Sequence, residues 1–85
     1  MILFSKHALS KFEILKRHGW ELRRENIEEA IMKPDRVESG RKGRRIAQKK
    51  IGEEHVLRVV YEMKKGNQEV ITFYPGRRSR YETQL

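Results

Sequence analysis

The chain has 85 residues, of which 38% are charged and 36% hydrophobic, with 20 Lys and Arg against 12 Asp and Glu. This length predicts a single domain over residues 1–85 and excludes a cofactor domain beside a separate substrate domain. The absence of cysteine excludes disulfides, thiol catalysis and Cys-based zinc sites. No apolar run is long enough to span a membrane, and residues 1–4 are too short for a signal peptide, so we expect a cytoplasmic protein.

Two amphipathic helices are predicted after an apolar lead-in or short strand at residues 2–4. The first covers residues 6–18, with Ser5 as its N-cap and Gly19 just after its end. The second covers residues 24–32, where apolar residues recur at helical spacing, and Pro34 ends it.

The second half of the chain has the features of strands. We expect them at residues 44–51, 55–63 and 70–74, with a further short edge strand at 36–39. The predicted fold is therefore α+β, with two N-terminal helices packed on one face of a small antiparallel sheet. Period-two alternation places Leu57, Val59, Ile71 and Phe73 under the helices. Arg58 and Tyr74 then belong to the uncovered face.

Positive charge is concentrated in the strand half. Residues 1–35 hold 7 basic and 6 acidic residues, whereas residues 36–85 hold 13 basic and 6 acidic ones. This asymmetry favours a polyanionic partner, with nucleic acid ahead of a membrane surface because no helix joins a basic face to a strongly apolar one.

An arginine and tyrosine set is the first candidate site. Its members are Arg58, Tyr74, Arg77, Arg78, Arg80 and Tyr81. Guanidinium groups bind phosphate and stabilise charge during RNA cleavage, tyrosine rings stack on bases, and a tyrosine hydroxyl can move a proton. The alternative is a solvated basic tail without a site.

A basic turn is the second candidate. It comprises Arg41, Lys42, Arg44 and Arg45 around Gly43, and it is followed by Lys49 and Lys50. These cations suit RNA tracking or an acidic partner, and equally suit the protection of an edge strand from aggregation.

Histidine offers a third candidate. His7, His18 and His55 fit no short metal motif, so neither a metal nor a cofactor is expected. His7 is a candidate general base because its ordinary pKa is near neutral, but a lone helical histidine is more often structural.

Two segments resemble a known superfamily. Residues 57–62 (LRVVYE) and 70–81 (VITFYPGRRSRY) resemble strands of the RelE/ParE-like toxins. The opening FSKHA at residues 4–8, with HG at 18–19, is similar to a small family of unknown function grouped with RelE- and BrnT-like toxins, in which His7 belongs to the signature.

The resemblance implies a toxin paired with an antitoxin protein, and in RelE-like members a metal-independent endoribonuclease that cuts mRNA, often on the ribosome. By this resemblance Arg58 contacts the scissile phosphate, Arg78 stabilises the transition state and Tyr81 takes part in proton transfer. Arg77 replaces a Lys or His of the family, and either Lys49 or Lys50 matches the basic residue on the preceding strand. Pro75 departs from the pattern.

Three functions follow in order of preference. The first is an endoribonuclease with Arg58, Arg78, Tyr81 and His7 as candidate catalytic residues. Its candidate RNA-binding residues are Arg44, Arg45, Lys49, Lys50, Tyr74, Arg77 and Arg80. The second is a ParE-like toxin that binds a protein target such as gyrase, and the third is an RNA-binding module without activity.

Overall fold

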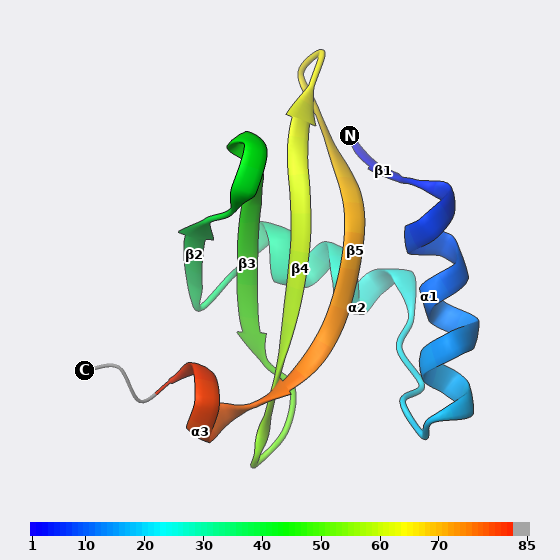
Figure 1. Cartoon of the computed structure of the whole chain (residues 1–85), viewed down its shortest axis with the longest axis vertical. Helices are drawn as coiled ribbons and strands as arrows, with labels where there is room; N and C mark the ends of the chain where they lie inside the picture. Colours follow the sequence, from blue (N-terminus) through cyan, green and yellow to red (C-terminus); the bar gives the residue numbers. More distant parts are fainter. Residues whose placement is uncertain (83–85) are drawn as a thin grey trace.

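The computed structural model describes residues 1–82 of the chain, shown in Figure 1. Its helices are α1 (Lys6–Arg17), α2 (Arg24–Met32) and α3 (Arg78–Tyr81), and a short 3-10 turn, η1, covers Arg41–Gly43. Its strands are β1 (Ile2–Phe4), β2 (Arg36–Ser39), β3 (Arg45–Lys50), β4 (His55–Lys64) and β5 (Asn67–Arg77). The predicted α+β class is confirmed.

The five strands form one mixed sheet in the order β1-β5-β4-β3-β2. The predicted antiparallel meander is correct from β2 to β5, but the expectation of a wholly antiparallel sheet is wrong, because β1 pairs with β5 in parallel. The N-terminus lies next to β5 in Figure 1, so residues 2–4 add a further strand to the sheet at the edge formed by β5.

The predicted helices α1 and α2 pack on one face of the sheet. Ser5 caps α1 by accepting a hydrogen bond from the Ala8 amide at 3.0 Å, and Gly19 follows the helix with a φ of +90°. Figure 1 shows α2 crossing behind the strands. Fully buried residues in this layer, such as Ile27 of α2 and Leu57 of β4, form the hydrophobic core.

A β-bulge corrects the predicted face of Ile71. Val60 pairs with Thr72, whereas the next β4 residue, Tyr61, pairs with Val70, so β5 carries one extra residue here. Val70 therefore joins Phe73 in the core, both with 0% exposure, and Ile71 is only partly buried. Uninterrupted alternation along the strand had predicted that Ile71, and not Val70, would share the core with Phe73.

The short helix α3 lies on the other face of the sheet, against β4 and β5. The sequence pattern did not predict it, because residues 78–81 contain no apolar repeat. Val56 of β4, which points to this face, is completely buried. The face that we expected to be uncovered is therefore closed at one end and open over the rest of β3, β4 and β5.

Within residues 1–82, no helix combines the length and the apolar character needed to cross a membrane.

Candidate functional site

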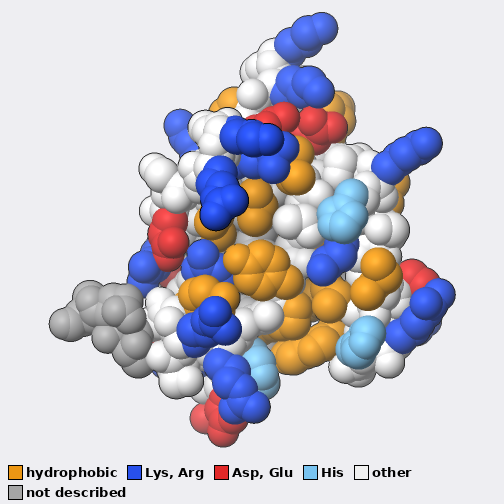
Figure 2. All heavy atoms as spheres, viewed as in Figure 1, with side chains coloured by type: hydrophobic (Ala, Val, Ile, Leu, Met, Phe, Trp, Pro, Cys, Tyr) orange, Lys and Arg blue, Asp and Glu red, His pale blue; other side chains and the backbone are white. Residues whose placement is uncertain are grey.

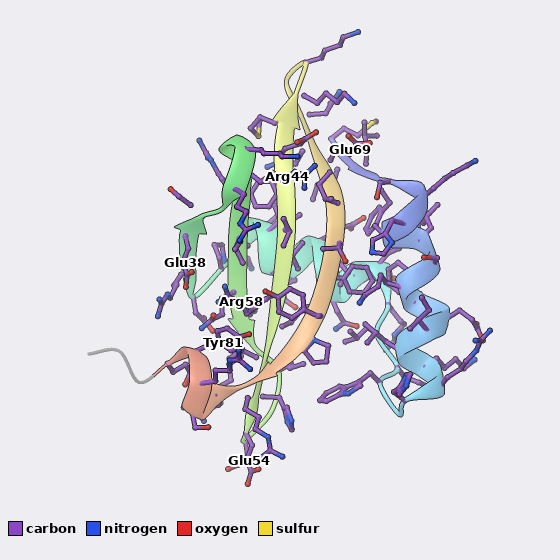
Figure 3. The ribbon with its side chains drawn as sticks, in the orientation of Figure 1. Glu38, Arg44, Glu54, Arg58, Glu69 and Tyr81 are labelled. Carbon is purple, nitrogen blue, oxygen red and sulfur yellow. The ribbon has the colours of Figure 1, made fainter. Side chains whose placement is uncertain are left out.

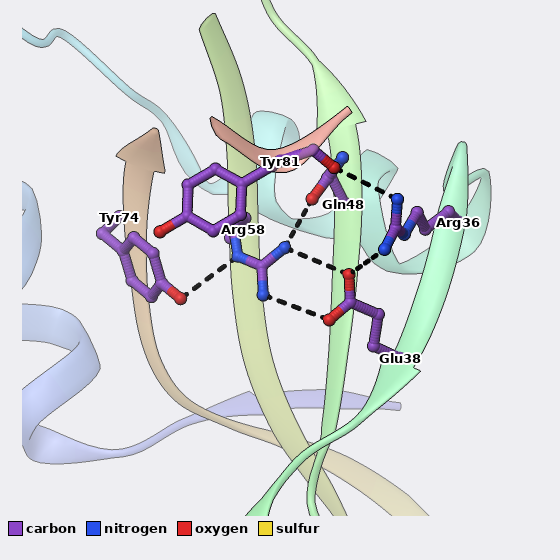
Figure 4. Close-up of polar contacts among 6 residues, drawn as sticks. All are labelled: Arg36, Glu38, Gln48, Arg58, Tyr74 and Tyr81. Carbon is purple, nitrogen blue, oxygen red and sulfur yellow. Dashed lines mark hydrogen bonds and ion pairs between the residues drawn. The ribbon is translucent and has the colours of Figure 1, made fainter. Parts of the chain in front are cut away.

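Three neighbouring strands place a row of polar side chains on the face opposite α1 and α2. Arg58 of β4 lies directly across from Gln48 of β3 on one side and from Tyr74 of β5 on the other. The predicted juxtaposition of Arg58 with Tyr74 on this face is correct. Figure 4 shows that the three side chains meet at the Arg58 guanidinium.

The Arg58 guanidinium is the centre of a closed hydrogen-bond network. Its Nε donates to the Tyr74 hydroxyl at 3.2 Å, and its Nη1 donates to Gln48 Oε1 at 2.5 Å. Both terminal nitrogens also donate to the Glu38 carboxylate, each at 3.4 Å. Arg58 as a whole is only 5% exposed. An arginine this deeply buried needs such a set of acceptors, because an unpaired buried charge is strongly destabilising.

The aromatic ring of Tyr81 covers this network. Its centroid lies 4.1 Å from Arg58 Cζ, and Arg80 approaches the same ring at 5.7 Å. The backbone of α3 is tied to the edge of the sheet by Arg36, which donates to the Tyr81 carbonyl at 3.1 Å and pairs with Glu38 at 2.7 Å. Cation–π attraction is strongest where water is excluded, as it is here.

The charges of the pair Glu38 and Arg58 stabilise each other. The hydrogen bond from Arg58 lowers the pKa of Glu38, against the opposing effect of burial. Burial is the largest single effect on Arg58 and lowers its pKa, but the hydrogen bonds to Tyr74 and Glu38 outweigh it, so the pKa of Arg58 is raised overall. Both groups are ionised at neutral pH.

Tyr74 is the polar group of this network that can act on a bound molecule. Its oxygen accepts the hydrogen bond from Arg58, so its own O–H remains able to donate. Tyr74 is partly exposed, and Arg80 of α3 is exposed next to the Tyr81 ring. This arrangement can present one proton donor and one exposed cation to an anion lying on the sheet.

Arg78 does not join the Arg58 network. Its Nε contacts Glu82 at 2.6 Å and its Nη1 donates to the Glu53 carbonyl at 2.8 Å, which fastens the start of α3 to the loop between β3 and β4. Arg78 lines a pocket there together with Glu53, Glu54 and the exposed Arg77. The structure thus separates two arginines that the resemblance places in one reaction.

The remaining predicted residues lie in three other places. His7 is exposed on α1, in the layer on the opposite side of the sheet. Lys49 points to that same side, where its Nζ donates to the Lys33 carbonyl at 2.9 Å after α2. Lys50 is exposed next to Gln48, and Arg44 and Arg45 lie at the far end of β3.

Sequence reasoning missed Glu38, Gln48 and Arg36 as members of the site. The pattern offers one signal, since Arg36 and Glu38 are two residues apart and therefore share a face of an edge strand. Their meeting with Arg58 depends on the pairing register of three strands, which composition does not reveal.

The part of the chain from Met1 to Glu82 contains no cluster of three or more His, Asp or Glu side chains suited to holding a metal ion. Comparison of the chain with protein-family models, with curated proteins and with solved structures gave no match in any of the three.

Proposed function

We propose that the open face of the sheet binds RNA and that the protein is a RelE-like endoribonuclease of the toxin type, acting without a metal ion and controlled by an antitoxin protein. The observation that carries the proposal is the Arg58–Tyr74 pair. A buried arginine holds a partly exposed tyrosine hydroxyl on a sheet face, within the half of the chain that has 13 basic and 6 acidic residues. A phosphate chain is the ligand that suits such a surface.

The reaction needs a proton donor at the leaving oxygen. The 2′-oxygen of the RNA attacks the adjacent phosphorus, the P–O5′ bond breaks, and the products carry a 2′,3′-cyclic phosphate and a 5′-hydroxyl. The 2′-hydroxyl proton passes to water at the open face, and the departing 5′-oxygen takes a proton from the Tyr74 hydroxyl, which regains one from solvent. The exposed Arg80 balances the charge of the crowded phosphorus centre.

In this proposal Arg58 is a positioning residue. With 5% exposure beneath Tyr81, it acts on the phosphate through Tyr74, not by direct contact. Tyr81 lies over the network and is partly exposed, so a base can stack against its ring beside Arg80. Arg78 anchors α3 through Glu82 and the Glu53 carbonyl.

One observation favours a second function without chemistry. The four residues first considered catalytic do not converge: Arg58 lies under Tyr81, Arg78 turns to the β3–β4 loop, and His7 is on the opposite layer. A surface that binds RNA, or a protein target as ParE-like toxins do, needs no convergence.

The deciding experiment incubates an end-labelled single-stranded RNA with the purified protein in excess EDTA and examines the termini of the products. We expect cyclic phosphate ends from the wild type and their loss in Tyr74→Phe. The matched control is Tyr61→Phe, which alters a tyrosine three residues from Arg58 on β4 but facing the helices. Its cleavage rate should equal that of the wild type.

Each other outcome assigns a different function. RNA binding without cleavage in the wild type would replace the enzyme with a binding module. Growth arrest on expression, with neither RNA binding nor cleavage, would favour a protein target. Equal cleavage by Tyr74→Phe and the wild type would remove Tyr74 from the mechanism.

A further inference from the structure

Two hairpin turns lie together at the end of the sheet farthest from α3. The first is η1 between β2 and β3, and the second joins β4 to β5 at Lys65 and Gly66. Arg45 at the start of β3 pairs with Tyr61, and β4 continues three residues beyond that point. An ion pair of 3.3 Å between Arg44 and Glu62 links the first turn to β4, and both turns lie at the top of the sheet in Figure 1.

Both turns present positive charge that nothing in the described chain neutralises. The exposed side chains of Arg41, Lys42, Arg45 and Lys65 make no hydrogen bond or ion pair within residues 1–82, whereas the neighbouring Arg44 and Lys64 pair with Glu62 and Glu69. Figure 2 shows blue side chains gathered at this end of the molecule. The local acidic residues thus already form ion pairs. Arg41, Lys42 and Lys65 are left in the turns for a ligand, whereas Arg45 pairs with Tyr61 and belongs to the helix side of the sheet.

The backbone of these turns gives an independent sign that lysine is there for its charge. Lys42 has a φ of 57° and Lys65 a φ of 52°, the left-handed conformation that glycine and asparagine adopt at lower cost. Each is followed by a glycine, Gly43 or Gly66, whose surroundings are open. Two separate turns therefore keep a lysine where folding alone favours another residue, a form of local strain that is typical of functional positions.

The two ends of the sheet also differ in charge. The opposite end carries Glu53 and Glu54 in the loop between β3 and β4, and Figure 3 shows Glu54 there, with Arg58 and Tyr81 between it and the hairpin end. Arg77 and Arg78 line a pocket with these carboxylates, so charges of both signs meet at that end, whereas the unpaired charge at the turns is positive. Seven residues of extended chain separate Arg58 from Lys65, a distance of about 23 Å.

We infer that the two turns form a second phosphate-binding site for the same RNA strand, which runs along β4 and β5 from Tyr74 to Lys42 and Lys65. This inference rests on the proposed binding of RNA to the open face. It adds a contact about 23 Å from the Arg58–Tyr74 pair, so a strand long enough to reach both sites binds more tightly than a short one.

The test measures the binding of 2′-O-methyl RNA oligonucleotides, which cannot be cleaved, by fluorescence anisotropy. We expect a strand of about twelve nucleotides to bind the wild type at least tenfold more tightly than one of about four. In the double variant Lys42→Asn with Lys65→Asn, this gain should disappear while binding of the short strand is kept. For the long strand, the logarithm of the association constant should fall less steeply with the logarithm of the salt concentration. The slope should be smaller by about 1.4, because two phosphate contacts are lost.

A control variant that loses the same two positive charges elsewhere separates the effect of a local site from the effect of net charge. Lys6→Gln with Lys16→Gln removes two exposed lysines of α1 on the opposite layer. Its affinity for the long strand should match the wild type. The asparagine variant should also unfold at the same or a higher denaturant concentration, because asparagine suits a positive φ, so lost binding cannot be ascribed to a lost fold.

Four outcomes would overturn the inference. An unchanged affinity of the asparagine variant for the long strand would leave the turns without a role. An equal loss in both double variants would show only an effect of net charge, while binding to poly-glutamate that depends on Lys42 and Lys65 alone would assign the turns to an acidic protein. Retained binding of the short strand in any of these cases leaves the proposed RNA function standing, whereas no binding of either strand to the wild type would overturn both.

Discussion

Gly76 leaves open the space that the Tyr81 ring occupies. A Cβ atom at residue 76 would overlap Cε2 of that ring and would lie 2.8 Å from Cδ2. Gly76 pairs with Val56 in the sheet, so the ring rests on bare backbone next to Arg58. This close approach is what lets a four-residue helix cover a buried guanidinium.

Gly76→Ala should therefore lower the free energy of unfolding by about 1–3 kcal/mol, the usual cost of overpacking. Its φ is outside the left-handed region, so the backbone itself accepts alanine. Urea unfolding followed by Trp20 fluorescence measures the change. In a Tyr81→Ala background the same substitution should cost nothing, because the clashing ring is gone. An equal cost in both backgrounds would show that Tyr81 does not lie over Gly76.

Glu38→Gln should destabilise the fold by about 1–3 kcal/mol. It leaves the charge of Arg58 buried without its carboxylate, which in a fully buried pair costs about 3–5 kcal/mol. Glu38 is 30% exposed, and Tyr74 and Gln48 still accept from Arg58, so the loss is smaller.

Glu13→Gln is the control for this change in a denaturation experiment. It breaks the exposed pair of Glu13 with Arg17, whose side chains are 66% and 72% exposed at 3.9 Å, and should cost less than about 0.5 kcal/mol. If the two variants lose equal stability, the Glu38–Arg58 pair behaves as a surface pair and the network contributes little to the fold.

The elements of the fold that sequence reasoning predicted are those with local signals. Ser5, Gly19 and Pro34 mark the ends of α1 and α2, and the predicted bounds of 6–18 and 24–32 differ from the structure by at most one residue. The parallel pairing of β1 with β5 joins residues 2–4 to 68–70, a contact that no local pattern contains. The bulge falls within Val70-Ile71-Thr72, where three β-branched residues give no alternation to read.

The site was predictable to a similar extent. Period two placed Arg58 and Tyr74 on one face, but their direct pairing depends on the bulge, because the register at the hairpin would pair Arg58 with Phe73. Alternation does not show whether another element covers a face of the sheet. The burial of Arg58 beneath Tyr81 could therefore not be predicted from the sequence. Neighbours in sequence also diverge: Arg78 and Tyr81 share one turn of helix and point to different partners.

Ser5→Ala should lower the stability by about 1–2 kcal/mol through two lost hydrogen bonds. The Ser5 hydroxyl accepts from the Ala8 amide at 3.0 Å and donates to the Ile71 carbonyl at 3.1 Å, so it ties the start of α1 to the bulged segment of β5. Ser10→Ala is the control, because its hydroxyl contacts only the His7 carbonyl on an exposed turn. Thermal unfolding of both variants compares them, and an equal small loss would mean that the cap is dispensable.

The pair of Glu38 with Arg58 should also give the fold a defined acid sensitivity. The hydrogen bond from Arg58 lowers the pKa of Glu38 in the folded protein below its ordinary value of 4.5. Above that ordinary value the carboxylate is ionised in both states, and its full contribution to stability is present. As the pH falls below it, the unfolded chain takes up the proton first, so stability declines until the folded carboxylate is protonated as well.

The free energy of unfolding of the wild type should therefore exceed that of Glu38→Gln by a constant amount at about pH 6 to 7, and the difference should shrink on going to about pH 3. Arg58 contributes no slope of its own in this range, because its raised pKa keeps it charged throughout. Urea titrations of both proteins at a series of pH values measure the difference directly. A gap that stays constant down to about pH 3, or that widens in acid, would show that the pKa of Glu38 is not lowered by folding and that its contact with Arg58 is not an ion pair in solution.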